Sequence, residues 1–64
     1  MTRPRYLTPK QVADIRRKSE PALVQERKRG IGPPFIRDGG RILYPEDELY
    51  AWLDARLVRT DSKA

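Results

Sequence analysis

Two helix-start signals lie so close together in this sequence that they largely decide what it can fold into. Thr8 is a favoured N-cap residue, Pro9 suits the first helical position, and Gln11 completes a capping box. Ser19 is the next favoured N-cap residue. If the first helix continues to residue 17, only Lys18 remains to connect the two helices. A link this short forces the helices to cross sharply, as they do in a helix-turn-helix.

The first helix is predicted over residues 9–17. Leu7 and Val12 occupy the two positions of a hydrophobic staple at its start. We expect Val12, Ile15 and Ala13 to face the core, because they follow helical spacing.

The second helix is predicted to begin after Ser19 and to end at Gly30. Glu20 lies where the helix macrodipole favours an anion, and Pro21 falls in the first turn, where its missing N–H breaks no intrahelical bond. Glycine is the residue most often found just beyond the end of a helix.

A β-ribbon is predicted over residues 35–44, with the Asp-Gly-Gly sequence of residues 38–40 as its turn. We prefer a three-residue loop, because a two-residue loop would shift the pairing by one position and mix the two faces. With three residues in the loop, Arg37 and Arg41 pair on one face near the tip. The apolar side chains expected on the other face, against the core, are Ile36, Ile42 and Tyr44.

A third helix is predicted to start at Pro45, with three acidic residues in its first turn, where the macrodipole stabilises them. These residues are Glu46, Asp47 and Glu48. An apolar stripe follows at helical spacing, formed by Leu49, Trp52, Leu53 and Leu57. We expect Trp52 to lie at the centre of the core rather than to stack on nucleic acid.

Composition limits the functions open to the chain. With 64 residues it forms at most one domain with a small core, and it contains neither cysteine nor histidine, which are common metal ligands and catalytic groups. Its carboxylates are not accompanied by a nucleophile, base or ligand cluster. We therefore expect no enzyme, no metal or other cofactor and no small-molecule ligand. The sequence also lacks a membrane-spanning apolar run and a signal peptide, which favours a soluble cytoplasmic protein.

The net charge of +5 is unevenly distributed. Residues 1–30 contain nine Lys and Arg against three Asp and Glu, whereas residues 45–64 contain three against five. A basic first half suggests a polyanionic partner, with double-stranded DNA or another nucleic acid ahead of an anionic membrane surface.

The order helix, tight turn, helix, hairpin, helix predicts a mainly α fold with a small β-hairpin, the architecture of a winged helix-turn-helix. On DNA, a helix of this kind fits the major groove, and a ribbon with arginines at its tip reaches the phosphate backbone or a narrow minor groove. We expect a basic arm at residues 1–5, the domain at residues 6–59 and a flexible tail at residues 60–64.

Four segments of the chain resemble the excisionase/AlpA-like DNA-binding family, a relative of the MerR winged helices. They are "LTPKQVAD" in the first helix, Ser19 followed by "AL" in the second, "GPPFIRDGGRILY" through the ribbon and "ELYAWL" in the last helix, and together they cover about residues 6–57. The resemblance implies sequence-specific DNA binding by a cytoplasmic protein. The family includes excisionases (recombination directionality factors) of phages and mobile elements, and small AlpA-like transcriptional regulators.

Three functions follow from these observations. An excisionase would bind and bend attachment-site DNA, associate side by side on it and assist a site-specific integrase. The shortness of the chain favours this function, because it leaves no room for an effector-sensing domain. The alternatives are a small transcriptional regulator and, from a different class, a protein-interaction module without DNA binding that docks a partner through its acidic last helix.

The chain departs from the family pattern within the helix-turn-helix. Family members commonly have leucine and glycine at the positions of Arg16 and Arg17, an apolar residue at Lys18 and often a tryptophan at Glu26. Helical spacing places Arg16 and Glu26 near the inner sides of the two facing helices. We therefore predict that these two residues form an ion pair. The alternative is that both side chains extend into water.

The outward face of the second helix supplies the first group of candidate DNA contacts. Gln25 is the candidate for reading a base, because its amide can both donate to and accept from adenine. Pro21 and Ala22 can contact a thymine methyl group. Lys28 and Arg29 are expected to meet phosphates.

The remaining candidates lie in the turn, the ribbon and the arm. Ser19 and the N–H groups at the start of the second helix can hold a phosphate. The candidates in the ribbon are Arg37, Gly39, Gly40 and Arg41, where the glycines permit a close approach to the sugar-phosphate backbone. The secondary candidates are Arg16, Arg17, Lys18, Arg3 and Arg5.

Overall fold

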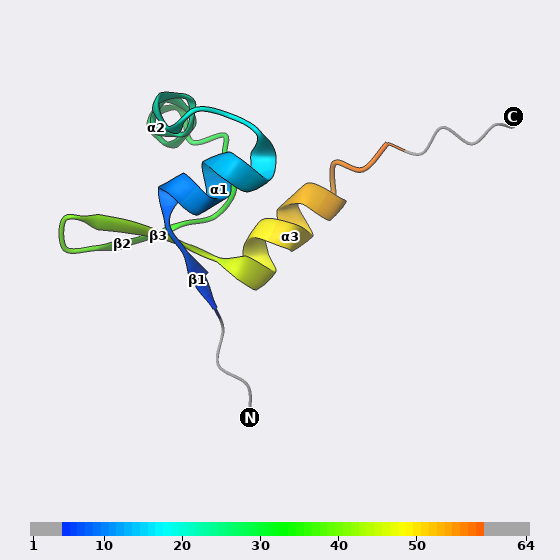
Figure 1. Ribbon diagram of the computed structural model, residues 1–64. Helices are drawn as coiled ribbons and strands as arrows, with labels where there is room; N and C mark the ends of the chain where they lie inside the picture. Colours follow the sequence, from blue (N-terminus) through cyan, green and yellow to red (C-terminus); the bar gives the residue numbers. More distant parts are fainter. Residues whose placement is uncertain (1–4, 59–64) are drawn as a thin grey trace, which may run out of the picture.

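The computed structural model describes residues 5–58 of the chain. Its elements follow the order β1, α1, α2, β2, β3, α3 (Figure 1). The helix-turn-helix, the two-stranded wing and the final helix appear in the predicted order, which confirms the fold class. The predicted tail and all of the predicted arm except Arg5 lie outside the described residues. The elements are β1 (Tyr6–Leu7), α1 (Pro9–Arg16), α2 (Glu20–Arg29), β2 (Ile36–Asp38), β3 (Arg41–Pro45) and α3 (Glu46–Asp54).

The predicted capping box fixes the start of α1. The Thr8 hydroxyl accepts a hydrogen bond from the Gln11 backbone N–H at 3.2 Å, and the Gln11 side chain accepts one from the Thr8 N–H at 2.9 Å. The helix ends at Arg16, one residue earlier than predicted, because Arg17 turns into the left-handed region with φ 57°. The Lys18 N–H then donates to the Ala13 carbonyl at 2.8 Å, which closes the end of the helix.

Helix α2 begins and ends as its sequence predicts. The Ser19 hydroxyl accepts a hydrogen bond from the Ala22 N–H at 3.2 Å, and Gly30 ends the helix with φ 69°. Between the last residue of α1 and the first of α2 lie residues 17–19, and the two helices cross sharply (Figure 1). The link is therefore three residues long rather than the one predicted, and the sharp crossing expected of a short link is present.

The wing has a different register from the predicted one. Ile36 pairs with Leu43, Arg37 with Ile42 and Asp38 with Arg41, so the loop holds two residues, Gly39 and Gly40, rather than three. Gly39 has φ +64°, and a positive φ at the first of two central residues is required by the type II′ turn, whose twist suits a hairpin. The prediction of a three-residue loop is therefore wrong.

The shift in register separates the two wing arginines. Because cross-strand partners share a face, Arg37 lies on the same face as Ile42 and Tyr44, while Arg41 lies on the opposite face with Ile36. Ile36 is exposed and does not anchor the wing to the core, which corrects a second expectation.

A third strand, β1, was not predicted. Tyr6 pairs with Pro45 and Leu7 with Tyr44, which makes a sheet in the order β1-β3-β2. The Glu46 N–H at the start of α3 also donates to the Arg5 carbonyl at 2.7 Å. The start of the described chain is thereby attached to the base of the wing.

The core contains fewer side chains than the sequence suggests. Trp52 is half-buried and Ile15 is exposed, so the predictions that placed these two inside the core are wrong, and Leu57, the last residue of the predicted apolar stripe, is exposed as well. Tyr44, with 1% of its surface exposed, is the largest fully buried side chain. Phe35, Ile42 and Leu53 pack against the core from outside it. Its buried members are Leu7, Val12, Ala13, Leu23, Tyr44 and Leu49.

Candidate nucleic-acid interface

The exposed side of α2 carries most of the side chains expected there. Ala22 differs from the others in being half-buried, because it lies beside the fully buried Leu23. The exposed members of the predicted set are Pro21, Gln25, Lys28 and Arg29. The last turn of the helix is basic throughout, formed by Arg27, Lys28 and Arg29. An amide that can read a base therefore lies on the same exposed helix as a basic last turn.

In Figure 1, α2 lies above α1, the wing extends to the left and α3 extends to the right. Contacts between side chains connect α2 to the wing. The Arg27 guanidinium donates from Nη1 to the Tyr44 hydroxyl at 2.7 Å, and its Cζ lies 5.8 Å from the centroid of the Phe35 ring. The helix and the ribbon are therefore held next to each other, as two adjacent surfaces for one ligand.

Arg37 and Arg41 are exposed at the wing but do not form the predicted pair on one face. Arg41 lies directly opposite Asp38, and Arg37 lies on the core side of the ribbon with its Cζ 5.7 Å from the Phe35 centroid. The tip therefore presents a cation on each side, with Gly39 and Gly40 between them.

Arg16 and Glu26 form the predicted ion pair. Arg16 donates from Nη1 to Glu26 Oε1 at 2.6 Å and from Nη2 to Oε2 at 2.9 Å, in a bidentate arrangement. Only 6% of the Arg16 side chain and 16% of the Glu26 side chain is exposed. The guanidinium of Arg16, a secondary candidate for DNA contact, is therefore occupied between the helices.

Several cations surround the Glu26 carboxylate. The hydrogen bond from Arg16 lowers the pKa of Glu26, against the opposite effect of burial, and the charges of Arg16, Lys18 and Arg56 lower this pKa further. Lys18 Nζ lies 3.9 Å from Glu26 Oε2. Gly32 leaves room for the carboxylate, since a Cβ there would lie 2.9 Å from Glu26 Oε1.

The ion pair continues into a stack on α3. The Cζ atoms of Arg16 and Arg56 lie 4.8 Å and 3.6 Å from the centroid of the Trp52 ring. A guanidinium over an indole ring gains cation–π attraction. Trp52 therefore connects α3 to the helix-turn-helix through charged side chains and not as the centre of an apolar core.

The other predicted cations remain at the surface. Arg17 and Lys18 are exposed in the turn, and Arg5 is exposed beside β1. Arg3 lies outside the described residues. Ser19 is exposed too, with its hydroxyl engaged in capping α2.

Arg27 was absent from the predicted set, although it connects α2 to the wing. Helical spacing from the buried Leu23 places Arg27 near the inner face of α2, away from the residues expected to face DNA. The sequence did indicate that such a contact was needed. Tyr44 was expected to face the core, and a buried tyrosine hydroxyl needs a hydrogen-bond partner.

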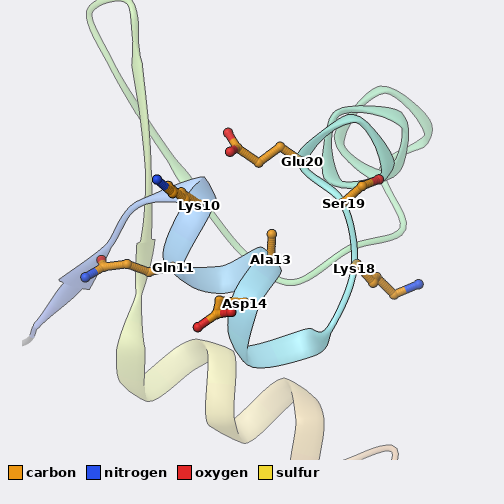
Figure 2. Close-up of a pocket in the computed structure, with 7 residues that line it drawn as sticks. All are labelled: Lys10, Gln11, Ala13, Asp14, Lys18, Ser19 and Glu20. Carbon is orange, nitrogen blue, oxygen red and sulfur yellow. The ribbon is translucent and has the colours of Figure 1, made fainter.

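Figure 2 shows an open hollow between α1 and the start of α2. Both signs of charge line it, with Lys10 and Lys18 against Asp14 and Glu20. This mixture offers no net attraction for a polyanion. Among residues 5–58 no group of three or more acidic side chains could hold a metal ion, and no helix in this range is long and apolar enough to cross a membrane.

Comparison with protein-family models gives a match. A family model described as a helix-turn-helix domain matches residues 6–57. No curated protein and no solved structure matches the chain. The matched range extends from β1 through α1, α2 and the wing to just beyond α3.

Proposed function

The chain belongs to this helix-turn-helix family and is a DNA-binding domain, and from that premise we propose that it is an architectural protein of the excisionase type. In this role it binds and bends attachment-site DNA so that a site-specific integrase can assemble an excision complex. The protein would act on DNA in the cytoplasm of a bacterial or phage-infected cell.

One observation carries the proposal: α2, whose other side is exposed, is connected to the base of the wing through Arg27, Tyr44 and Phe35. A helix in the major groove and a ribbon on the neighbouring backbone hold a duplex at two separate places. Contacts at two places supply the binding energy that offsets the cost of bending the DNA.

Individual residues take the following roles in this proposal. Gln25 reads a base in the major groove, beside apolar contacts from Pro21 and Ala22. Lys28 and Arg29 bind phosphates at the end of α2, and Ser19 lies near a phosphate at its start. The phosphate contacts of the wing and the turn come from Arg37, Arg41, Arg17 and Lys18, with Gly39 and Gly40 allowing the backbone to come close.

DNA binding itself has a simple test in salt. If five or six phosphates are contacted, the logarithm of the association constant falls against the logarithm of salt concentration with a slope of roughly −5. Arg41→Gln should weaken binding to all sequences, whereas Gln25→Ala should relax the preference at one base pair of a site selected from random duplexes. A flat salt response would instead favour a protein-interaction module.

The excisionase role requires a recombination assay. Integrase and a plasmid with two attachment sites are incubated with and without the protein, and the excised circle is quantified. The proposal expects excision to depend on the protein and gel mobility to reveal a bend in bound DNA. Binding without an effect on excision would favour a transcriptional regulator.

Self-association belongs to the same proposal. The protein is expected to be a monomer in solution and to associate side by side on DNA with adjacent sites. Sedimentation without DNA and the steepness of binding to a duplex with repeated sites measure the two states. A stable dimer without DNA would contradict this part of the proposal.

A further inference from the structure

Two guanidinium groups lie around the ring of Phe35 where α2 meets the wing. The Cζ atoms of Arg27 and Arg37 lie 5.8 Å and 5.7 Å from the centroid of this one ring. Arg27 comes from the last turn of α2 and Arg37 from β2. An anion bound to both guanidinium groups would be attracted by two positive charges at once.

One of these cations is fixed in place before any ligand arrives. The Arg27 side chain donates to the hydroxyl of the buried Tyr44 at 2.7 Å, and the Tyr44 ring lies 6.1 Å from the Phe35 ring at an interplanar angle of 51°. A guanidinium has five N–H donors, of which this bond uses one. A side chain that is already ordered loses little conformational entropy when it binds.

Neither guanidinium has a carboxylate partner in the part of the chain that the structure describes. The ion pairs within residues 5–58 are those of Glu26 with Arg16 and with Lys18. Asp38 follows Arg37 in the sequence but lies on the opposite face of the ribbon. The planar fork of a guanidinium matches the oxygens of a phosphate group, which makes a phosphate the fitting anion.

We propose that Arg27 and Arg37, held on the ring of Phe35, bind one backbone phosphate of duplex DNA at the junction of α2 and the wing. The inference rests on the DNA-binding function and adds Arg27 and Phe35 to the interface. The phosphate contact is independent of base sequence and fixes the position of the wing relative to the helix.

The test measures salt-dependent binding to a fluorescein-labelled duplex of mixed sequence. The double variant Arg27→Gln/Arg37→Gln should reduce the magnitude of the salt slope by about 0.9, because one phosphate contact is lost. Arg56→Gln is the control for loss of a cation outside the proposed site, because it lies just beyond the end of α3, and it should leave the slope unchanged. An unchanged slope in the double variant would overturn the proposal, and so would a decrease of about 1.8, which indicates two separate phosphates.

Further measurements separate this contact from folding and from DNA binding as such. Tyr44→Phe keeps both charges and removes the bond that fixes Arg27, so affinity should fall about tenfold with the slope retained, and circular dichroism checks that each variant folds. If Arg27→Gln does not fold, the variant Arg27→Met/Tyr44→Phe/Arg37→Gln takes its place, because it removes both charges without leaving the Tyr44 hydroxyl unpaired, and the same loss of slope is expected. If the wild type fails to bind duplex DNA, the function itself fails.

Inorganic phosphate, titrated while the arginine side-chain NMR signals are followed, should shift the signals of Arg27 and Arg37 together. If it does so while the double variant keeps the wild-type salt slope, the site binds a free anion and the DNA assignment is wrong.

Discussion

At the scale of single residues, charged side chains occupy positions between the helices where apolar side chains could pack without a cost of removing charge from water. Arg16 and Glu26 fill the space between α1 and α2 as a bidentate pair that is largely withdrawn from water. Removing two charges from water costs nearly as much as their attraction returns, so such a pair adds little stability. Removing one partner alone is costly, because the other charge stays buried.

Glu26→Ala is therefore expected to lower the free energy of unfolding by about 3 kcal/mol. Glu26→Leu should cost nearly as much, since it also leaves the Arg16 charge unbalanced, whereas Arg16→Leu/Glu26→Leu should recover most of the loss. Urea unfolding followed by circular dichroism measures all three. Glu48→Ala, at an exposed glutamate of α3, is the control and should change little. Additive losses in the double variant would contradict the pairing.

The same ion pair makes stability depend on acid. The pKa of Glu26 is lowered from its ordinary value of 4.5 in the folded protein, so the unfolded state binds the proton more tightly. The stabilisation that this carboxylate provides is complete at pH values above 4.5. It is lost as the pH falls through the lower pKa that Glu26 has in the folded protein. Glu26→Gln should lack this component. Urea unfolding at pH values above and below 4.5 compares the two proteins, and identical pH profiles would refute the assignment.

Arg17 carries a side chain through a left-handed turn, with φ 57°. For a residue with a Cβ this conformation costs about 1–2 kcal/mol. After allowing for the greater freedom of glycine when unfolded, Arg17→Gly should raise the free energy of unfolding by about 0.5–1 kcal/mol. Arg17→Ala removes the same charge but keeps the Cβ, so it should bring no such gain. Thermal unfolding distinguishes the two variants.

At the scale of elements, local chemistry predicted the helices better than the sheet. Thr8, Ser19 and Gly30 each act within a few residues of their own positions, which is why the ends of α1 and α2 were readable. The wing was ambiguous because an Asp-Gly-Gly sequence accommodates both loop lengths, and pairing across the strands decided between them. Strand β1 is only two residues long and has no periodicity to recognise.

In the candidate interface, too, the features decided by nearby residues could be predicted, and those decided by contacts between distant residues could not. The exposed face of α2 could be predicted from helical spacing alone, as Gln25, Lys28 and Arg29 show. The roles of Arg27 and of the two wing arginines depended on how the ribbon packs against the helix. That packing is decided by contacts between residues far apart in the sequence.

The two glycines of the wing turn should differ in their tolerance of substitution. A Cβ added at either position would meet no atom within 4 Å, but only Gly39 has a positive φ. Gly39→Ala should therefore destabilise the wing by about 1 kcal/mol, while Gly40→Ala should be nearly neutral. Chemical denaturation gives the stabilities. The opposite order would mean that the turn is not the one described.

At the scale of the whole molecule, a few buried side chains hold the fold together. Leu23 and Leu49 are fully buried, each from a different helix, and they belong to one core with Tyr44 and Val12. A core of this size supplies no more than about 3–5 kcal/mol of net stability. A ligand that binds only the folded state, such as duplex DNA, would add to this small margin.

Leu23→Ala should remove about 2–5 kcal/mol and leave little folded protein at room temperature. Duplex DNA at about a hundred times its dissociation constant should return about 2.7 kcal/mol, because only the folded state binds. Circular dichroism with and without duplex tests both expectations. Val24→Ala, at an exposed position of the same helix, is the control. A variant as stable as the wild type would show that Leu23 is not central to the core.

The ion pair between α1 and α2 also has an evolutionary consequence. Positions 16 and 26 are not free to change one at a time. A protein in which only one of the two residues was replaced would keep the other charge buried and unpaired inside the domain. Substitutions at the two sites should therefore occur together. Relatives with an apolar residue at one should have an apolar residue at the other, and an alignment of close homologues would display this as paired variation.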